Sequence, residues 1–117
     1  MDRGVYTLEE IQSQPEAWTA AGEVLQEHLP EIQEIFHREP YSQVIFTGCG
    51  STYYLAMAAA AGLQEASGLT ARALPASELW LYPRSSYPSS GRTLLVAVSR
   101  SGETTETLRA CGAFLDA

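Results

Sequence analysis

Lysine is absent from this chain of 117 residues, and all seven of its basic residues are arginine. Within this chain, the absence excludes a lysine that forms a Schiff base and the lysine of a nucleotide-binding P-loop. Cysteine is scarce as well. Cys49 and Cys111 stand far apart without a CxxC spacing, which excludes a structural zinc site and a disulfide-rich secreted scaffold. We therefore expect no metal, no cofactor and two reduced thiols.

Long hydrophobic runs are also missing. The longest weakly polar stretch, residues 54–63, is too short to span a bilayer. The first residues soon turn acidic, and no secretory signal is visible among them. These features predict a soluble, cytoplasmic protein with no membrane partner.

Positive charge is in deficit, with 14 acidic residues against seven basic ones and a net charge of −7. The imbalance lies entirely in residues 1–40, which carry nine acids and two arginines, whereas residues 41–117 carry five of each. Binding to nucleic acid draws on basic side chains that neutralise phosphates. An acidic first part and a neutral remainder therefore argue against a nucleic-acid partner.

Residues 1–40 are predicted to form a helical leader with a solvated acidic face. Pro15 and Pro30 predict that the leader is broken into separate short helices, because proline lacks the N–H that a helix interior needs. The apolar residues that recur three and four apart on one helical face are Trp18, Ala21, Leu25 and Leu29.

Residues 41–117 alternate between strand and helix patterns, which predicts an α/β fold with a parallel sheet. We expect a three-layer, flavodoxin-like sheet with strand order 2-1-3, in which the helix at 51–67 is buried because it is apolar nearly all round. Open sheets of this class usually have five or more strands, so the domain is expected to be incomplete. The predicted elements are a strand at 44–47, a helix at 51–67, a strand at 70–74, a helical turn at 77–80, a strand at 93–98 and a helix from 103.

Two polar loops follow predicted strands and lead into predicted helices. Residues 48–52 read Gly-Cys-Gly-Ser-Thr, and residues 99–104 read Ser-Arg-Ser-Gly-Glu-Thr. The free N–H groups and positive dipole at a helix start favour an anion, and hydroxyl groups add further donors. In the order 2-1-3 the two loops flank one crevice, which indicates a small phosphorylated ligand. The alternative interpretation is that these residues only cap two helices.

The same two motifs resemble those of the SIS (sugar isomerase) phosphosugar-binding domain. The pattern is similar to that of tagatose-6-phosphate ketose/aldose isomerase-like proteins and of the isomerase half of glutamine–fructose-6-phosphate aminotransferase. Arg100 stands where the aminotransferase pattern has Gln, which favours the isomerase-like branch. On this resemblance, residues 1–40 precede a partial SIS domain at 41–117. The sugar-phosphate contacts that the resemblance implies are Gly50, Ser51, Thr52, Ser99, Arg100, Ser101, Gly102 and Thr104.

The resemblance implies a chain that binds a hexose or amino-sugar phosphate as part of an aldose–ketose isomerase or aminotransferase-like protein. The alternative is a regulatory module that senses a sugar phosphate without catalysis. The family's acid/base residues and its lysine lie beyond the matched stretch, so we expect the chain alone to be inactive, and its catalytic residues stay unknown. The strand at 93–98 carries no charged residue or proline to protect an edge, which predicts a homo-oligomer or pairing with a missing C-terminal portion.

Overall fold

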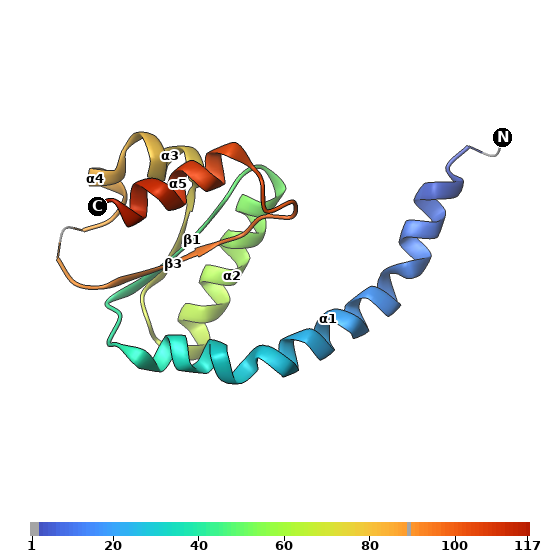
Figure 1. The fold of residues 1–117 in the computed structure, drawn as a ribbon, viewed down its shortest axis with the longest axis horizontal. Coiled ribbons are helices and arrows are strands. Elements are labelled where there is room, and N and C mark those ends of the chain that lie inside the picture. The colour runs from blue at the N-terminus through green and yellow to red at the C-terminus, as the bar shows by residue number, and fades with distance from the viewer. Residues whose placement is uncertain (1–2, 89) are drawn as a thin grey trace. The chain divides into compact units, whose positions relative to one another are not determined.

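The computed structural model describes residues 3–88 and 90–117, whose contacts form two compact units, Met1–Glu39 and Pro40–Ala117. The first unit contains helix α1 (Val5–Arg38), which is a single helix of 34 residues. The predicted breaks at Pro15 and Pro30 are wrong, because both prolines lie inside the helix. A proline in a helix removes one hydrogen bond and bends the axis, and good helix formers on both sides continue the helix beyond it. Figure 1 shows that α1 curves along its length.

The second unit is built on three parallel strands in the order β2-β1-β3, as predicted. Strand β1 (Gln43–Gly48) lies between β2 (Ala71–Pro75) and β3 (Thr93–Ala97). In the register of the sheet, Val44 of β1 lies opposite Ala71 of β2 and Leu94 of β3. The predicted α/β class and strand order are therefore confirmed.

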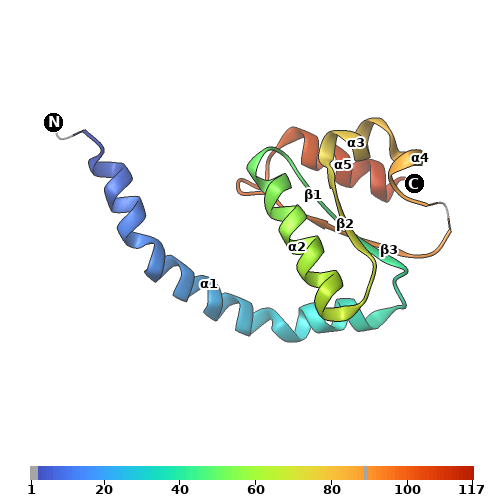
Figure 2. The same ribbon diagram turned by 180° about the vertical axis from the view of Figure 1, so that it is seen from behind.

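Helices cover both faces of the sheet, which gives three layers. Helix α2 (Ser51–Ser67) lies on one side, while α3 (Ala76–Leu81) and α5 (Thr105–Leu115) lie together on the other (Figures 1 and 2). A further short helix, α4 (Pro83–Ser86), occupies part of the loop that connects α3 to β3. Ser89 of that loop lies outside the described residues.

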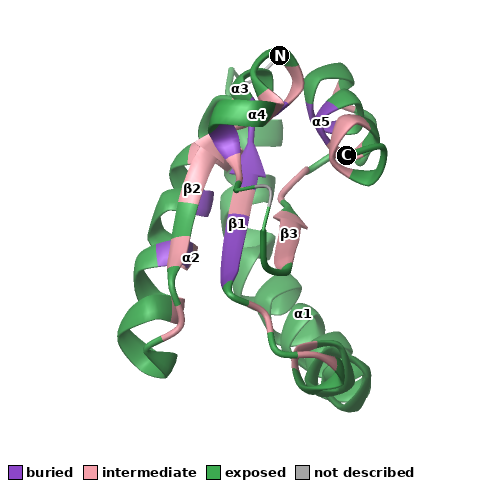
Figure 3. Cartoon of the chain, turned by 90° about the vertical axis from the view of Figure 1, so that its left-hand side faces the viewer, coloured by how far each residue is buried: buried purple, intermediate pink, exposed green. Residues whose placement is uncertain are grey.

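The core lies between the sheet and the pair α3–α5. Ile45, Ala76, Leu79 and Ala110 form its buried cluster, with Leu95 packed against it. Figure 3 shows that burial is greatest on β1, while β3 is only partly buried.

Helix α2 is less buried than its composition predicts. Only Ala56 and Ala60 of this helix are buried, whereas Tyr54 and Leu55 are 70% and 59% exposed. Helix α2 packs on β1 and β2, and a helix that lies on a sheet turns only one face toward it. None of the described helices combines the length and the apolar character needed to cross a membrane.

Candidate functional site

The two polar loops meet at the carboxyl edge of the sheet, where β1 leads into α2 and β3 leads toward α5. They line a shared cavity of about 340 Å³, which we call the loop cavity. Because β1 and β3 are neighbours and parallel, the segments that follow them leave the same edge of the sheet side by side. The residues that line the loop cavity are Cys49, Ser51, Thr52, Arg100, Ser101 and Thr104.

Five of the eight residues expected at the site thus line one cavity. The other three, Gly50, Ser99 and Gly102, belong to the same loops but do not line it. Cys49 lines it and was missing from the expected set. Its position between two loop glycines, directly after β1, is the sequence signal that points to it.

The first loop is closed by the hydroxyl group of Thr52. Its Oγ1 accepts a hydrogen bond from the main-chain N–H of Cys49 at 2.9 Å and donates one to the Cys49 carbonyl oxygen at 2.9 Å. The Thr52 proton is therefore engaged within the loop, and this residue shapes the cavity wall. Ser51 makes no side-chain hydrogen bond within the described residues, so its hydroxyl is free to face a ligand.

The second loop is held by two serine hydroxyl groups that act as acceptors. The Oγ of Ser99 accepts the N–H of Gly102 at 2.9 Å, and the Oγ of Ser101 accepts the N–H of Glu103 at 3.1 Å. Gly102 adopts a φ of 73°, which favours glycine. The main-chain N–H of Gly102 is consequently used inside the loop. The hydroxyl proton of Ser101 stays available, because only its oxygen is engaged.

The electrostatics of the loop cavity favour an anion. The helices α2 and α5 begin at Ser51 and Thr105, and a helix start carries a partial positive charge. At the start of α2, the N–H groups of Thr52 and Tyr53 already donate to the carbonyl oxygens of Cys49 and Gly50, so this helix contributes mainly through its dipole. Arg100 lines the cavity and forms no ion pair among the residues that the structure describes. Carboxylates are absent from the residues that line this cavity.

Cys49 joins the first loop to α5. Its Sγ lies 3.5 Å from the Oγ1 of Thr107, which is only 4% exposed. The contact fixes the start of α5 against the end of β1, so the two loops keep a defined spacing. This favours a packing role for Cys49 over that of a nucleophile.

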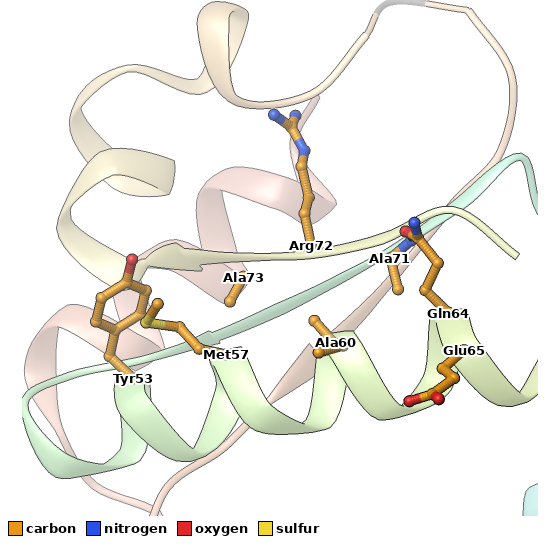
Figure 4. A pocket seen from close by; sticks show the side chains of 9 residues that line it. Tyr53, Met57, Ala60, Gln64, Glu65, Ala71, Arg72 and Ala73 are labelled. Atoms are coloured by element: carbon orange, nitrogen blue, oxygen red, sulfur yellow. The ribbon is translucent and has the colours of Figure 1, made fainter.

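Other hollows lie nearby but differ in chemistry. A cavity of about 300 Å³ that also borders the first loop is lined in part by Tyr53, Ser77 and Glu106. A larger groove of about 590 Å³ lies between α2 and β2. Figure 4 shows that Met57 and Ala60 project into this groove, while the side chain of Arg72 points away from α2. Its interior is mainly apolar, so the loop cavity is the better candidate for a phosphate.

Known proteins resemble the chain in sequence and in fold, although no protein-family model matches it. It is 35% identical over 72 residues to glutamine–fructose-6-phosphate aminotransferase [isomerizing] from Helicobacter pylori strain J99, a match that covers 62% of this chain and 12% of that protein. It superposes on the crystal structure of tagatose-6-phosphate ketose/aldose isomerase from Escherichia coli with a TM-score of 0.86 and 23% identity, over 97% of this chain and 31% of that one.

The predicted resemblance is confirmed. The superposition shows that almost the whole chain shares the fold of one part of the isomerase. The chain spans about an eighth of the aminotransferase and under a third of the isomerase.

Proposed function

We propose that the chain binds a phosphorylated sugar, a hexose or amino-sugar phosphate, and that the loop cavity holds the phosphate. One observation carries the proposal: two loops rich in serine and threonine, separated by about fifty residues of sequence, line one cavity where two helices begin. The names of both similar proteins refer to hexose 6-phosphates, which supports a role connected with sugar phosphates.

We assign as phosphate donors the groups that line the loop cavity and whose protons no described hydrogen bond uses. The hydroxyl groups of Ser51, Ser101 and Thr104 have protons that no described contact engages, and the guanidinium of Arg100 adds a charged donor. Thr52 and Ser99 hold the loops in shape. The proposed role of residues 41–117 is therefore that of a partial SIS domain in which hydroxyl groups supply most of the donors.

Binding, and not proton transfer, is the activity that we propose for these residues. Transfer of a proton between neighbouring carbons of a sugar requires an acid/base group, and the loop cavity is lined by neither carboxylate nor imidazole. The chemistry of an isomerase or an aminotransferase would need groups in addition to these.

Isothermal titration calorimetry tests the proposal with fructose 6-phosphate, glucosamine 6-phosphate and tagatose 6-phosphate. Unphosphorylated fructose serves as the matched ligand control, and AMP and FMN represent nucleotides. We expect at least one hexose phosphate to bind and fructose not to bind. Binding of the nucleotides without any hexose phosphate would refute the proposal.

The variant Ser101→Ala tests the assigned donors. Loss of one hydrogen bond to an anion weakens binding by about 1–2 kcal/mol, or roughly 5- to 30-fold in the dissociation constant. Ser85→Ala is the matched control, because its hydroxyl donates to the Tyr82 carbonyl outside the loop cavity. If Ser101→Ala kept full affinity while Arg100→Ala abolished binding, the hydroxyl groups would not be the principal donors.

A further inference from the structure

Helix α1 carries an apolar seam that becomes evident because the helix is continuous. Along its whole length, apolar residues recur with alternating steps of three and four, which is the heptad pattern of helices that pair side by side. The seam consists of Leu8, Ile11, Pro15, Trp18, Gly22, Leu25, Leu29, Ile32 and Phe36.

The bulkiest member of the seam lies between its two smallest. Trp18 is 71% exposed, and Pro15 and Gly22 are its seam neighbours one turn away on either side. A large side chain that projects beside small ones leaves room for a facing helix to approach closely. The seam therefore has the shape of a surface that another helix covers.

Charge separates the seam from the rest of α1. All seven glutamates of the helix lie away from the seam, and the positions that flank it hold uncharged Gln12, Thr19, Gln26 and Gln33 on one side. The other flank holds Gln14, Ala21, His28 and Ile35. In paired helices the flanking positions face each other across the seam, where like charges repel. Glu31 contacts one flank, with its Oε2 3.4 Å from the Nδ1 of His28, and the other six glutamates occupy neither the seam nor its flanks. A second copy of this acidic helix can therefore approach the seam with its glutamates outside the contact.

The length of the seam identifies the kind of partner. A helix of 34 residues is about 51 Å long. A globular unit of the size of Pro40–Ala117 is only about 30 Å across, from its expected radius of gyration of about 12 Å. The seam of nine residues runs the full length of α1 and is thus longer than a unit of this diameter. Another long helix has the length to cover it.

We propose that α1 is a dimerisation helix and that its seam pairs with the seam of α1 from a second copy of the chain. The glutamates then face solvent on the outside of the pair, where Glu34 and Arg38 form an ion pair at 3.3 Å. This proposal is independent of the ligand of the loop cavity.

The test compares two neighbouring substitutions of the same kind in the full chain. Leu25→Asp places a charge in the seam, whereas Val24→Asp places it on the outer face beside Glu23 and Glu27. Sedimentation equilibrium measures the mass. We expect the unmodified chain and Val24→Asp to sediment at twice the chain mass of 12.7 kDa. We expect Leu25→Asp to raise the dimer dissociation constant about 100-fold or more, because the charge would be buried without a partner.

Circular dichroism and thermal denaturation would show that Leu25→Asp keeps the fold of the second unit. A monomeric unmodified chain would overturn the proposal. So would a dimer that survives Leu25→Asp, or one that Val24→Asp dissociates equally well, because the contact would then lie elsewhere.

Discussion

Gly48 is the residue on which the geometry of the first loop depends most directly. It ends β1, is buried, and faces the first turn of α2. A Cβ added at Gly48 would lie 2.6 Å from the Oγ1 of Thr52 and 2.8 Å from its carbonyl carbon. Non-bonded carbons normally stay about 3.5–4.0 Å apart. Because one clashing atom belongs to the main chain, rotation of a side chain cannot relieve the overlap.

We expect Gly48→Ala to lower the free energy of unfolding by about 1–3 kcal/mol, the usual cost of an overpacked buried site. In a domain of this size each kcal/mol lowers the Tm by about 4–8 °C. The same shift of α2 moves Ser51 and breaks the hydrogen bonds between Thr52 and Cys49, so the affinity for the proposed sugar-phosphate ligand should fall as well.

Gly62→Ala is the matched control for this change. Gly62 lies inside α2, and a Cβ there would meet nothing within 4 Å. Alanine in a helix interior is favoured over glycine by about 0.5–1 kcal/mol, so this variant should gain stability and keep its affinity. Thermal and urea denaturation measure both variants. A Gly48→Ala protein as stable as the unmodified chain would refute the close approach of β1 and α2.

Two further predictions concern the region of β3. Burial raises the pKa of Tyr87 above its ordinary value of 10.0, so the neutral form is favoured in the folded state. The stability that this residue contributes is present below pH 10 and is lost as the pH rises above 10. The variant Tyr87→Phe keeps the ring contact with Phe114 but has no hydroxyl group to ionise. Urea denaturation at pH 9–11 should therefore show a smaller alkaline loss of stability for this variant. Ala97→Lys places a charge on the exposed end of β3 and should reduce association through this edge, which light scattering measures. An unchanged scattering signal would show that this edge does not pair.

The strand order was predictable because each strand has a distinct apolar run and because sequential α/β connections allow few arrangements. Which of the three strands is the most buried was harder to predict. The strand at 93–98 is the most hydrophobic, yet β1 is the central and most buried strand. Thr47 shows why composition misleads: it is fully buried, and its hydroxyl group donates to the Leu74 carbonyl oxygen at 2.8 Å. A paired hydroxyl is tolerated in a core, and hydropathy does not register the pairing.

Helix faces were predicted less well than helix positions. In the last helix Leu108, Cys111 and Leu115 recur three and four residues apart, which predicts a buried face. Leu108 is nevertheless 55% exposed, while Thr107 and Ala110 are buried. Small residues face the core because α5 packs closely on α3, where the guanidinium of Arg109 lies 4.4 Å from the ring centre of Trp80. The two polar loops that line the loop cavity were evident from their serines and threonines. The bonds that engage Thr52 and Gly102 depend on atomic positions that a one-dimensional pattern does not contain.

The two edges of the sheet differ in how their main-chain groups are protected. Along β2 the N–H of Ala71 donates to the side-chain Oε1 of Gln64 at 2.9 Å, and Pro75 has no N–H, so this edge offers little to a further strand.

Along β3, the N–H of Val98 donates to the carbonyl oxygen of Thr47, so the main-chain groups of Val98 face β1. Because these groups alternate in direction along a strand, the N–H and C=O groups of Thr93, Leu95 and Ala97 point outward. In the described part of the chain no strand pairs with this side. A strand that joined β3 in parallel would end at the edge that holds the loop cavity. Under the proposed function, a segment paired with this open edge would therefore be placed to bring an acid/base group to the loop cavity.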